Sequence, residues 1–305
     1  MNITFFLKSY LRERPMFLGL IRAKEAELYQ RFPLKKPVLD VGVGDGFFAK
    51  ITFSQTYTNK CHPDVHRDPL AVTGLSRRSG PPPQRGPVQR REIPPLAVTS
   101  SKTPRNDSFQ IDVGLDLKNS RMGEAEKLGV YKKLVTFDGI KIPFPDNSFN
   151  TVVSNCVLEH VENLDGLLYE IRRVLKPGGL FLTTVVSDNW EKYLLGGLFF
   201  GDRYRTWMRK KQVHLNMLSE REWKKSFSKA GMKIDQEIGY LDRKAVRLID
   251  LSHYLSAGSL VSYKLLNKWV IWKGKPQFFL SLLSKLISPD LPPDNSGNLF
   301  FSLQK

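Results

Sequence analysis

Three glycines, each separated from the next by one residue, follow an apolar run near the beginning of the chain. In the stretch "PVLDVGVGDGFFA" (37–49), the apolar run 38–41 predicts a buried strand, and Gly42, Gly44 and Gly46 predict a tight turn before a helix. Glycine has no Cβ and tolerates positive φ, so this turn can approach a bound molecule closely. Two classes of nucleotide-like cofactor are held by such turns, and they differ in charge.

The residues around the glycines favour a cationic ligand over a pyrophosphate. The pyrophosphate-binding pattern G-x-G-x-x-G would need its third glycine at the position of Phe47, whereas Asp40 stands two residues before Gly42. A carboxylate beside the turn suits a positively charged ligand. S-adenosylmethionine carries a sulfonium and an ammonium, no phosphate, and ribose hydroxyls that can donate to an acid. We therefore interpret the turn as a site for S-adenosylmethionine.

A second acid stands where such a cofactor needs one. The stretch "IDVGLDL" (111–117) predicts a strand with Asp116 at its end, 70 residues after Gly46. Dinucleotide-type units place this acid about 20 residues after the glycines. The 50 residues of 61–110 account for the difference. We expect them to be inserted between a helix and a strand, at the sheet edge opposite the ligand crevice.

The inserted residues 61–110 differ from the rest of the chain in composition. They hold nine of its 19 prolines and eight Lys/Arg against four Asp/Glu, without helical or strand periodicity. Such a segment cannot bury enough apolar surface to offset its ordering entropy, so we predict disorder. A Pro-rich ligand for a partner domain is the alternative. Cys61, His62 and His66 are joined by no second cluster of ligands, and we predict no metal site.

Four segments in order complete a wider pattern: "LDVGVGDG", "GLDL", "TFDGIKIPFPDNSFNTVVSNCVLEHV" and "LLYEIRRVLKPGGLFLTTV". Over 37–60 and 111–186 the chain resembles the class I S-adenosylmethionine-dependent methyltransferases of the small-molecule type. It departs from many relatives at Val43, where they have cysteine. The resemblance implies an α/β fold, a Rossmann-like doubly wound sheet of seven strands with an antiparallel edge hairpin, with helical appendages.

The resemblance also implies roles for the site residues. The glycines would lie against the methionine portion of the cofactor, with Asp40 near its ammonium. Asp116 would accept hydrogen bonds from the ribose hydroxyls. Asp138, after the predicted strand "KLVTFDG", would bind the adenine amine, and Gly139 would leave room for the ring. Asn155 and Cys156, at the end of the predicted strand "FNTVVSN", would line the crevice near the transferred methyl. Ordinary strand-end turns are the alternative for both Asp116 and Asp138.

Two histidines are candidates for the general base that a hydroxyl acceptor would need within hydrogen-bond reach. His160 in "LEHVEN" follows the fourth strand, close to the crevice. A histidine that caps or packs against the next helix is the alternative there. His214 lies in "KKQVHLNMLSEREW", after the fifth strand, where relatives contribute substrate contacts. We interpret Glu159 as a structural or cofactor-side acid rather than a base.

Composition limits the cellular setting and the partners. The 305 residues are 41% hydrophobic, enough for a sizeable core, and two cysteines suggest a reducing compartment. No run of 18 apolar residues occurs, so we expect a cytoplasmic, non-spanning protein. The net charge of +17 suits nucleic acid, an acidic substrate or anionic lipid. The motif Asn/Asp-Pro-Pro-Tyr/Phe of exocyclic-amine methylation is absent after the fourth strand, which disfavours DNA as a partner but not RNA methylation in general. We expect a small-molecule acceptor rather than nucleic acid.

Two segments bear on the acceptor. Residues 190–211 combine aromatic and basic side chains that could cover a sugar, an isoprenoid head group or a phosphorylated lipid, or form a partly exposed lid. Residues 251–287 are apolar but broken by lysines. There, Trp269 and Trp272 beside Lys268 and Lys273 suit the interface of an anionic membrane, at its inner face. A helical appendage packed over the sheet is the alternative.

The predicted organisation follows from these patterns. Apolar spacing predicts a helix that begins at Leu164 with Asn163 as N-cap, then a strand over 179–186 after "KPGG". "GMKIDQEIGYL" and "NLFFSLQK" would pair as the edge hairpin. The predicted parts are an N-terminal helical segment (1–36), a methyltransferase core (37–240) with its insert, a helical appendage (241–296) and a terminal edge strand of the core (297–305).

The predicted function is methyl transfer from S-adenosylmethionine to a small molecule, with a saccharide or a lipid-linked precursor as the leading acceptor. Quinone-type ring methylation, which shares the "LEHV" pattern, is one alternative. The other is a catalytically silent protein that keeps the fold and binds RNA or a protein partner through its basic surface.

Overall fold

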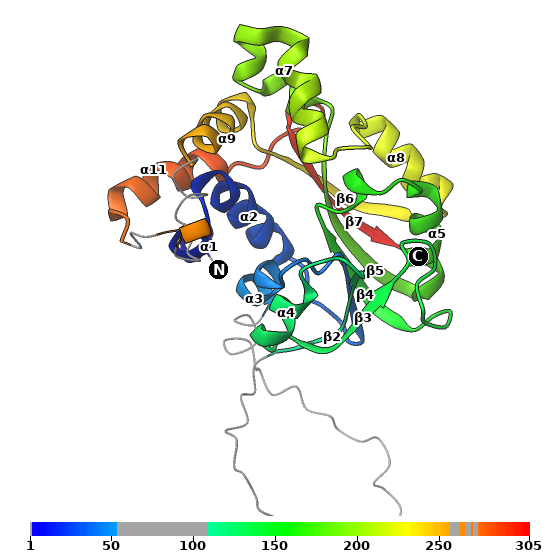
Figure 1. Cartoon of the computed structure of the whole chain (residues 1–305). Coiled ribbons are helices and arrows are strands. Elements are labelled where there is room, and N and C mark those ends of the chain that lie inside the picture. The colour runs from blue at the N-terminus through cyan, green and yellow to red at the C-terminus, as the bar shows by residue number, and fades with distance from the viewer. Residues whose placement is uncertain (1, 54–108, 257–262, 266–269, 271–273) are drawn as a thin grey trace, which may run out of the picture. The chain divides into compact units, whose positions relative to one another are not determined.

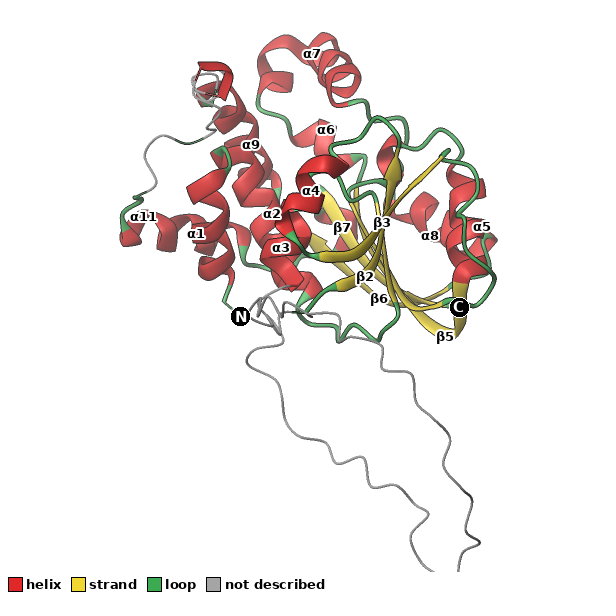
Figure 2. Cartoon of the chain, turned by 60° about the horizontal axis from the view of Figure 1, so that its bottom comes forward, coloured by secondary structure: helices red, strands yellow, loops and turns green. Residues whose placement is uncertain are grey.

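Seven strands of the described residues form one sheet, in the order β3-β2-β1-β4-β5-β7-β6 (Figures 1 and 2). This computed structural model describes residues 2–53, 109–256, 263–265, 270 and 274–305, all within the unit made of Met1–Asn59 and Ser108–Lys305. The strands are β1 (Val38–Val41), β2 (Ile111–Leu117), β3 (Tyr131–Phe137), β4 (Phe149–Asn155), β5 (Leu175–Val186), β6 (Lys233–Tyr240) and β7 (Asn298–Gln304).

The strand directions confirm the predicted doubly wound sheet. The five strands from β3 to β5 run parallel, and β7 pairs antiparallel with both β5 and β6. Leaving β1, the chain passes to β2 on one side, whereas β4 lies on the other side. A ligand crevice forms at the carboxyl ends of parallel strands where the winding reverses in this way, which here is between β1 and β4.

Helices cover both faces of the sheet. They are α1 (Ile3–Glu13), α2 (Met16–Tyr29), α3 (Phe47–Phe53), α4 (Met122–Leu128), α5 (Leu164–Val174), α6 (Asn189–Tyr193), α7 (Gly196–Gln212), α8 (Glu220–Lys229), α9 (Arg243–Leu255) and α11 (Gln277–Ile287), with short 3₁₀ turns η1 (Leu158–His160) and η2 (Pro293–Asn295). Alternate residues of a strand face opposite sides. Leu182 faces the apolar cluster of α1, α2, α9 and α11, and Phe181 faces that of α5 and α8 (Figure 1).

Local signals explain where several helices begin and end. The Asn163 side chain accepts a hydrogen bond from the Gly166 N–H at 3.0 Å, which confirms the predicted N-cap of α5. Helix α8 begins with a capping box of Ser219 and Glu222. Helix α4 ends at Gly129, whose φ of 64° is the left-handed conformation that terminates helices.

The beginning of β5 differs from the prediction. We expected a helix through Leu175 and a strand from Gly179, but β5 begins at Leu175, directly after α5. Leu175 pairs with Phe149 before the register shifts, and the ladder resumes further along at Leu180. Gly178 has φ of 69°, so the chain bulges out of the ladder there. The "KPGG" motif therefore marks a bulge within a strand, and not only the end of a helix.

The N-terminal and C-terminal helical segments lie side by side. Apolar residues of α1, α2, α9 and α11 share one buried cluster. The Lys24 side chain is fully buried, and its Nζ is 2.8 Å from an oxygen of Asp290 and 2.7 Å from the Ser288 carbonyl. The side-chain hydroxyls of Thr4 and Ser284 are 2.9 Å apart. Two segments at opposite ends of the sequence thus form one helical layer.

Several predictions concern residues outside the described ones. The predicted disorder of 61–110 falls outside them as far as residue 108, as do Cys61, His62 and His66. The last two residues of that prediction are wrong: Phe109 is buried, and the Gln110 amide donates to the Gly129 carbonyl at 2.8 Å. Lys268, Trp269, Trp272 and Lys273 of the predicted membrane-interface segment also lie outside the described residues. None of the described helices has the length and apolarity needed to span a membrane.

Candidate functional site

A cavity of about 300 Å³ lies at the carboxyl ends of β1 and β4, in the predicted crevice. We call it the glycine-turn cavity. The glycine turn forms one wall, the turn after β4 a second, and side chains of α1, α2 and the loop between them a third. Its lining residues are Tyr10, Arg14, Leu18, Arg22, Asp40, Gly42, Val43, Gly44, Asp45, Phe47, Phe48, Ala49, Arg121, Asn155, Cys156 and Val157.

The three glycines of the turn have different roles. All have positive φ, at 86°, 57° and 72°. A Cβ on Gly42 would lie 2.2 Å from the Val157 side chain, and one on Gly46 would lie 2.9 Å from the Ala125 backbone. A Cβ on Gly44 would meet nothing within 4 Å. Gly42 and Gly46 thus permit close packing, whereas Gly44 leaves space beside the chain for a ligand. Gly46 does not line the cavity.

Asp40 is a buried acid in the wall of this cavity. It is 6% exposed, and the Tyr131 hydroxyl donates to its carboxylate at 2.6 Å. Burial raises the pKa of Asp40 to about 7, the Tyr131 hydrogen bond opposes this rise, and the nearby Asp116 carboxylate adds to it. A cation in the cavity would favour the ionised form. The residue therefore fits the predicted ammonium site.

The two strand-end acids hold the backbone around the crevice. Asp116 accepts hydrogen bonds from the Gly44 N–H at 2.6 Å and from the Leu117 N–H at 2.7 Å. Asp138 is exposed and accepts from two N–H groups of the following turn. Gly139 has φ of 81°, and its Cβ position lies 3.2 Å from Leu117. Both acids thus have the turn role that we named as the alternative, and neither lines the glycine-turn cavity. Their roles toward ribose and adenine stay predictions.

A buried carboxylate that sequence reasoning missed lies behind the cavity. Glu25 of α2 has no solvent-exposed surface. Its oxygens are 2.6 Å from the Arg22 guanidinium, 3.0 Å from the Asn155 amide, 3.1 Å from the Cys156 sulfur and 3.1 Å from the Tyr240 hydroxyl. Predicted Asn155 is thus positioned by a helix of the N-terminal segment. No sequence motif marks Glu25, because an acid three residues after an arginine in a helix is typical of a solvated face.

Cys156 adopts an unusual backbone conformation at this point. Its φ is 51°, a left-handed value that costs energy for a residue with a side chain. The conformation turns the chain sharply after β4 and brings the sulfur against Glu25. Burial raises the pKa of the Cys156 thiol well above its usual range, and the charge of Glu25 adds to the effect. Cys156 therefore stays protonated and donates to the carboxylate.

The structure brings the two predicted histidines together, outside the lining of the glycine-turn cavity. The ring centroids of His160 and His214 are 5.2 Å apart. Nδ1 of His160 is 3.0 Å from the Val213 carbonyl, so it carries a proton and donates. Burial, followed by the charges of His160 and Arg209, lowers the pKa of His214 to about 4. His214 is therefore neutral at pH 7.

Glu159, which the sequence predicts to be a structural or cofactor-side acid, holds the segment after α7 through its backbone carbonyl. It is 1% exposed, and burial raises its pKa to about 7. Its backbone carbonyl accepts hydrogen bonds from the N–H groups of Leu215 and Asn216, at 2.8 and 3.0 Å. The Asn216 amide also donates to the Leu158 and Val161 carbonyls. These contacts attach the segment that carries His214 to the turn that carries His160.

Comparison with known proteins agrees with this geometry. Residues 105–183 match the model of a methyltransferase domain family. A sterol 24-C-methyltransferase of Gibberella zeae is 44% identical over 87 residues, 25% of this chain and 23% of that protein. A ubiquinone/menaquinone biosynthesis C-methyltransferase of Paraburkholderia phymatum is 41% identical over 63 residues, 21% of this chain and 26% of that protein. The chain thus spans about a quarter of the length of these curated relatives.

The fold itself recurs in solved structures. A Thermotoga maritima protein described as an S-adenosylmethionine-dependent methyltransferase, possible histamine N-methyltransferase, superposes with a TM-score of 0.50 at 14% sequence identity. The match covers 95% of this chain and 91% of that one. Together, the family match and the fold confirm the resemblance seen in the sequence.

Proposed function

We propose that this chain, which belongs to the class I S-adenosylmethionine-dependent methyltransferase family, transfers the methyl group of S-adenosylmethionine to a small-molecule acceptor. The observation that carries the proposal is the glycine-turn cavity, where an unobstructed Gly44 faces a buried acid and the end of β4. Calorimetry with S-adenosylmethionine tests it, with micromolar affinity as the expected result. Absence of binding would contradict the proposal and favour the catalytically silent protein.

Residues in the cavity wall, and Asp116 behind the glycine turn, suit the parts of that cofactor. Gly44 leaves room for the methionine portion, Asp40 suits the ammonium, and Asp116 has remaining acceptor capacity for the ribose hydroxyls. When bound, S-adenosylmethionine supplies a methyl group that its cationic sulfur makes electrophilic. The protein then has to orient the acceptor and exclude water. Residues of α1 and α2 such as Tyr10 and Leu18 close the cavity on one side.

The ionisation of Asp40 predicts a pH-dependent cofactor affinity. Because the pKa of Asp40 is raised to about 7, the carboxyl is mostly neutral at lower pH and mostly charged at higher pH. We expect affinity for S-adenosylmethionine to be several-fold higher at about pH 8 than at about pH 6, since only the charged form attracts the ammonium. Calorimetry at both values on the native protein and on Asp40→Asn measures it. An equal change in affinity between the two pH values in both proteins would refute the assignment of Asp40 to the ammonium site.

The acceptor is the finer part of the proposal. The curated relatives are named for sterols and for ubiquinone and menaquinone, which favours a lipophilic acceptor and supports quinone-type ring methylation as a candidate. A saccharide or lipid-linked precursor remains the acceptor proposed from the sequence. Mass spectrometry of metabolites from cells with and without the gene separates these classes by the compounds that lose one methyl group.

His214 is the candidate base for a hydroxyl acceptor. It is neutral at pH 7, and among the described residues its buried Nδ1 has no hydrogen-bond partner. We expect His214→Ala to lower kcat about 100-fold and leave the Kd for S-adenosylmethionine nearly unchanged. His253→Ala, at a half-buried histidine of α9, is the matched control. Equal turnover of His214→Ala and the native protein would remove His214 from the mechanism.

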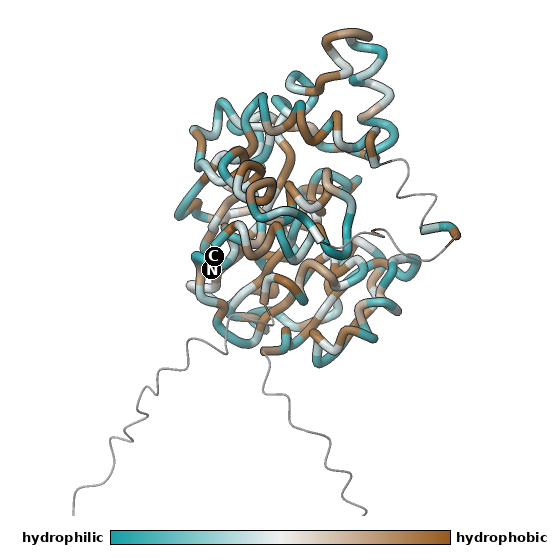
Figure 3. The backbone as a smooth tube through the Cα atoms, turned by 90° about the vertical axis from the view of Figure 1, so that its left-hand side faces the viewer, coloured by the Kyte–Doolittle hydropathy of each residue, from teal (hydrophilic) through white to brown (hydrophobic). Residues whose placement is uncertain are grey.

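Peripheral contact with an anionic membrane is proposed as well. Leu198, Phe199 and Phe200 of α7 are 55%, 75% and 69% exposed. Helix α7 lies at the top of Figures 1 and 3, where part of the tube has the brown of hydrophobic residues. Exposed Lys210 and Lys211 lie near the other end of α7, beyond a kink at Gly201. A segment that exposes both apolar side chains and lysines suits a membrane interface. Co-sedimentation with anionic vesicles detects such contact, and its absence at low salt would exclude it.

A further inference from the structure

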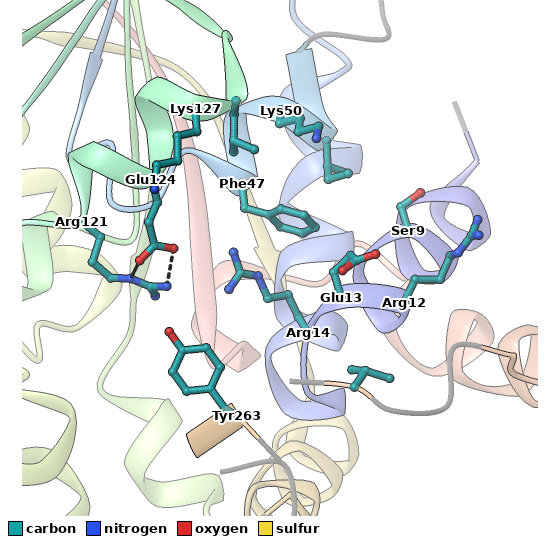
Figure 4. A pocket seen from close by; sticks show the side chains of 13 residues that line it. Ser9, Arg12, Glu13, Arg14, Phe47, Lys50, Arg121, Glu124, Lys127 and Tyr263 are labelled. Atoms are coloured by element: carbon teal, nitrogen blue, oxygen red, sulfur yellow. Dashed lines mark hydrogen bonds and ion pairs between the residues drawn. The ribbon is translucent and has the colours of Figure 1, made fainter. Parts of the chain in front are cut away.

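A second cavity, of about 830 Å³, lies among α1, α3 and α4 (Figure 4). Five basic residues line it: Arg12 and Arg14 at the end of α1, Lys50 of α3, Arg121 at the start of α4 and Lys127 of α4. We call it the basic cavity. In Figure 4 the guanidinium groups of Arg14 and Arg121 point toward one another across the space.

The lining of the basic cavity has an excess of positive charge. Its acids are Glu13 and Glu124, so three positive charges are in excess. Glu124 is paired with Arg121 at 2.7 Å. Within the described part of the chain, Arg12 and Lys127 have no ion-pair partner. Clustered like charges in a concave site repel one another and concentrate anions.

Two of the arginines are held in place at the junction with the glycine-turn cavity. Asp45 lies 2.5 Å from the Arg14 guanidinium and 3.4 Å from that of Arg121. The Arg14 guanidinium also lies over the Phe47 ring, 4.4 Å from its centroid. Arg14, Arg121 and Phe47 line both cavities. A guanidinium fixed in this way presents its remaining N–H donors to a ligand at little entropic cost.

The rest of the lining is mainly apolar, with hydroxyl groups added by Ser9 and Tyr263. Phe47, Ile51 and Leu128 supply a hydrophobic wall from α3 and α4. The volume is within the range of sites for small molecules, about 300–1,000 Å³. A free inorganic anion would leave this wall without a partner. The chemistry therefore calls for a ligand with a compact anionic group and an apolar part.

We propose that the basic cavity binds the phosphate group of an amphiphilic methyl acceptor, with the arginines as bidentate donors and the apolar wall against the rest of the molecule. The inference rests on the proposed function, because the shared residues place the phosphate beside the cofactor. The acceptor would then be a lipophilic molecule with a phosphate group, unlike a sterol or a quinone, which carries no phosphate.

Calorimetry with soluble dihexanoyl phosphatidate and with inorganic phosphate tests the proposal. The variant is Arg12→Gln/Lys127→Gln, which removes the two cations without ion-pair partners and leaves Arg14 and Arg121 in place. The control is Arg221→Gln/Lys225→Gln, two exposed cations of α8 with the same loss of charge. We expect phosphatidate to bind about tenfold more weakly to the variant than to the native protein and the control.

Each outcome supports or overturns the inference. Equal phosphatidate affinity in variant and control would show general attraction to a basic protein and overturn it. Inorganic phosphate that binds as tightly as phosphatidate would overturn the lipophilic part of the assignment. Affinity for S-adenosylmethionine is measured on the same samples and should not change in the variant. If the cofactor fails to bind while phosphatidate binding still depends on Arg12 and Lys127, the proposed function fails and the anion site stands.

Discussion

Replacing Gly44 by alanine is expected to weaken S-adenosylmethionine binding by about tenfold or more, which corresponds to about 1.4 kcal/mol. The new methyl group would meet no protein atom within 4 Å, so it projects into the space assigned to the cofactor. The φ of 57° at this position adds a folding cost of about 1–2 kcal/mol for a residue with a Cβ. Calorimetry and urea unfolding measure the two effects separately.

Gly178→Ala is the matched control. It has the same unfavourable backbone conformation as Gly44→Ala but takes no space from the cofactor. Gly178 lies in the bulge of β5 with φ of 69°, and a Cβ there also meets nothing within 4 Å. Both variants should lose similar stability, and only Gly44→Ala should lose cofactor affinity. Native-like affinity in Gly44→Ala would mean that the cofactor does not lie against this turn, and the proposed function would lose its main support.

Replacing Glu25 by alanine is expected to lower the free energy of unfolding by about 3 kcal/mol, the low end for breaking a buried ion pair. The Glu25 side chain is fully buried, whereas that of Arg22 is 23% exposed and can recover part of its hydration. The substitution also leaves the Tyr240 hydroxyl without its acceptor and leaves the Cys156 sulfur only its longer contact with the Thr184 hydroxyl, at 3.6 Å. Unpaired buried polar groups add to the cost.

Urea unfolding of Glu25→Ala and Glu126→Ala measures this effect. Glu126 is an exposed acid of α4, and its replacement should change stability by less than about 0.5 kcal/mol. Glu25→Gln keeps the shape of the side chain and removes its charge, so its free energy of unfolding should lie between those of the two alanine variants. Equal unfolding midpoints for Glu25→Ala and Glu126→Ala would show that the network does not stabilise the fold. Cofactor affinity should also fall in Glu25→Ala, because the Asn155 side chain loses the acceptor of its N–H group and keeps only the hydrogen bond that Thr184 donates to its oxygen.

The sequence by itself determined the sheet and the glycine turn. Strand signals are local: apolar runs that end in glycine, an acid or asparagine predicted β1, β2, β3 and β4 in order, and Asn163 predicted the start of α5. These predictions agree with the structure because the backbone conformation of a strand or a turn depends mainly on residues that are close in sequence. The beginning of β5 was the exception, since a positive-φ glycine serves a helix end and a strand bulge equally well.

Only the tertiary structure decided what surrounds the turn. Glu25 and Cys156, 131 positions apart, are in contact because α2 packs over the end of β4. Arg14 and Arg121 likewise come from distant segments, and both line the two cavities. A charged residue on an amphipathic helix has the same sequence pattern whether it faces water or a site. Its role depends on the packing of distant segments, and that packing is set by burial of whole helix faces rather than by any short motif.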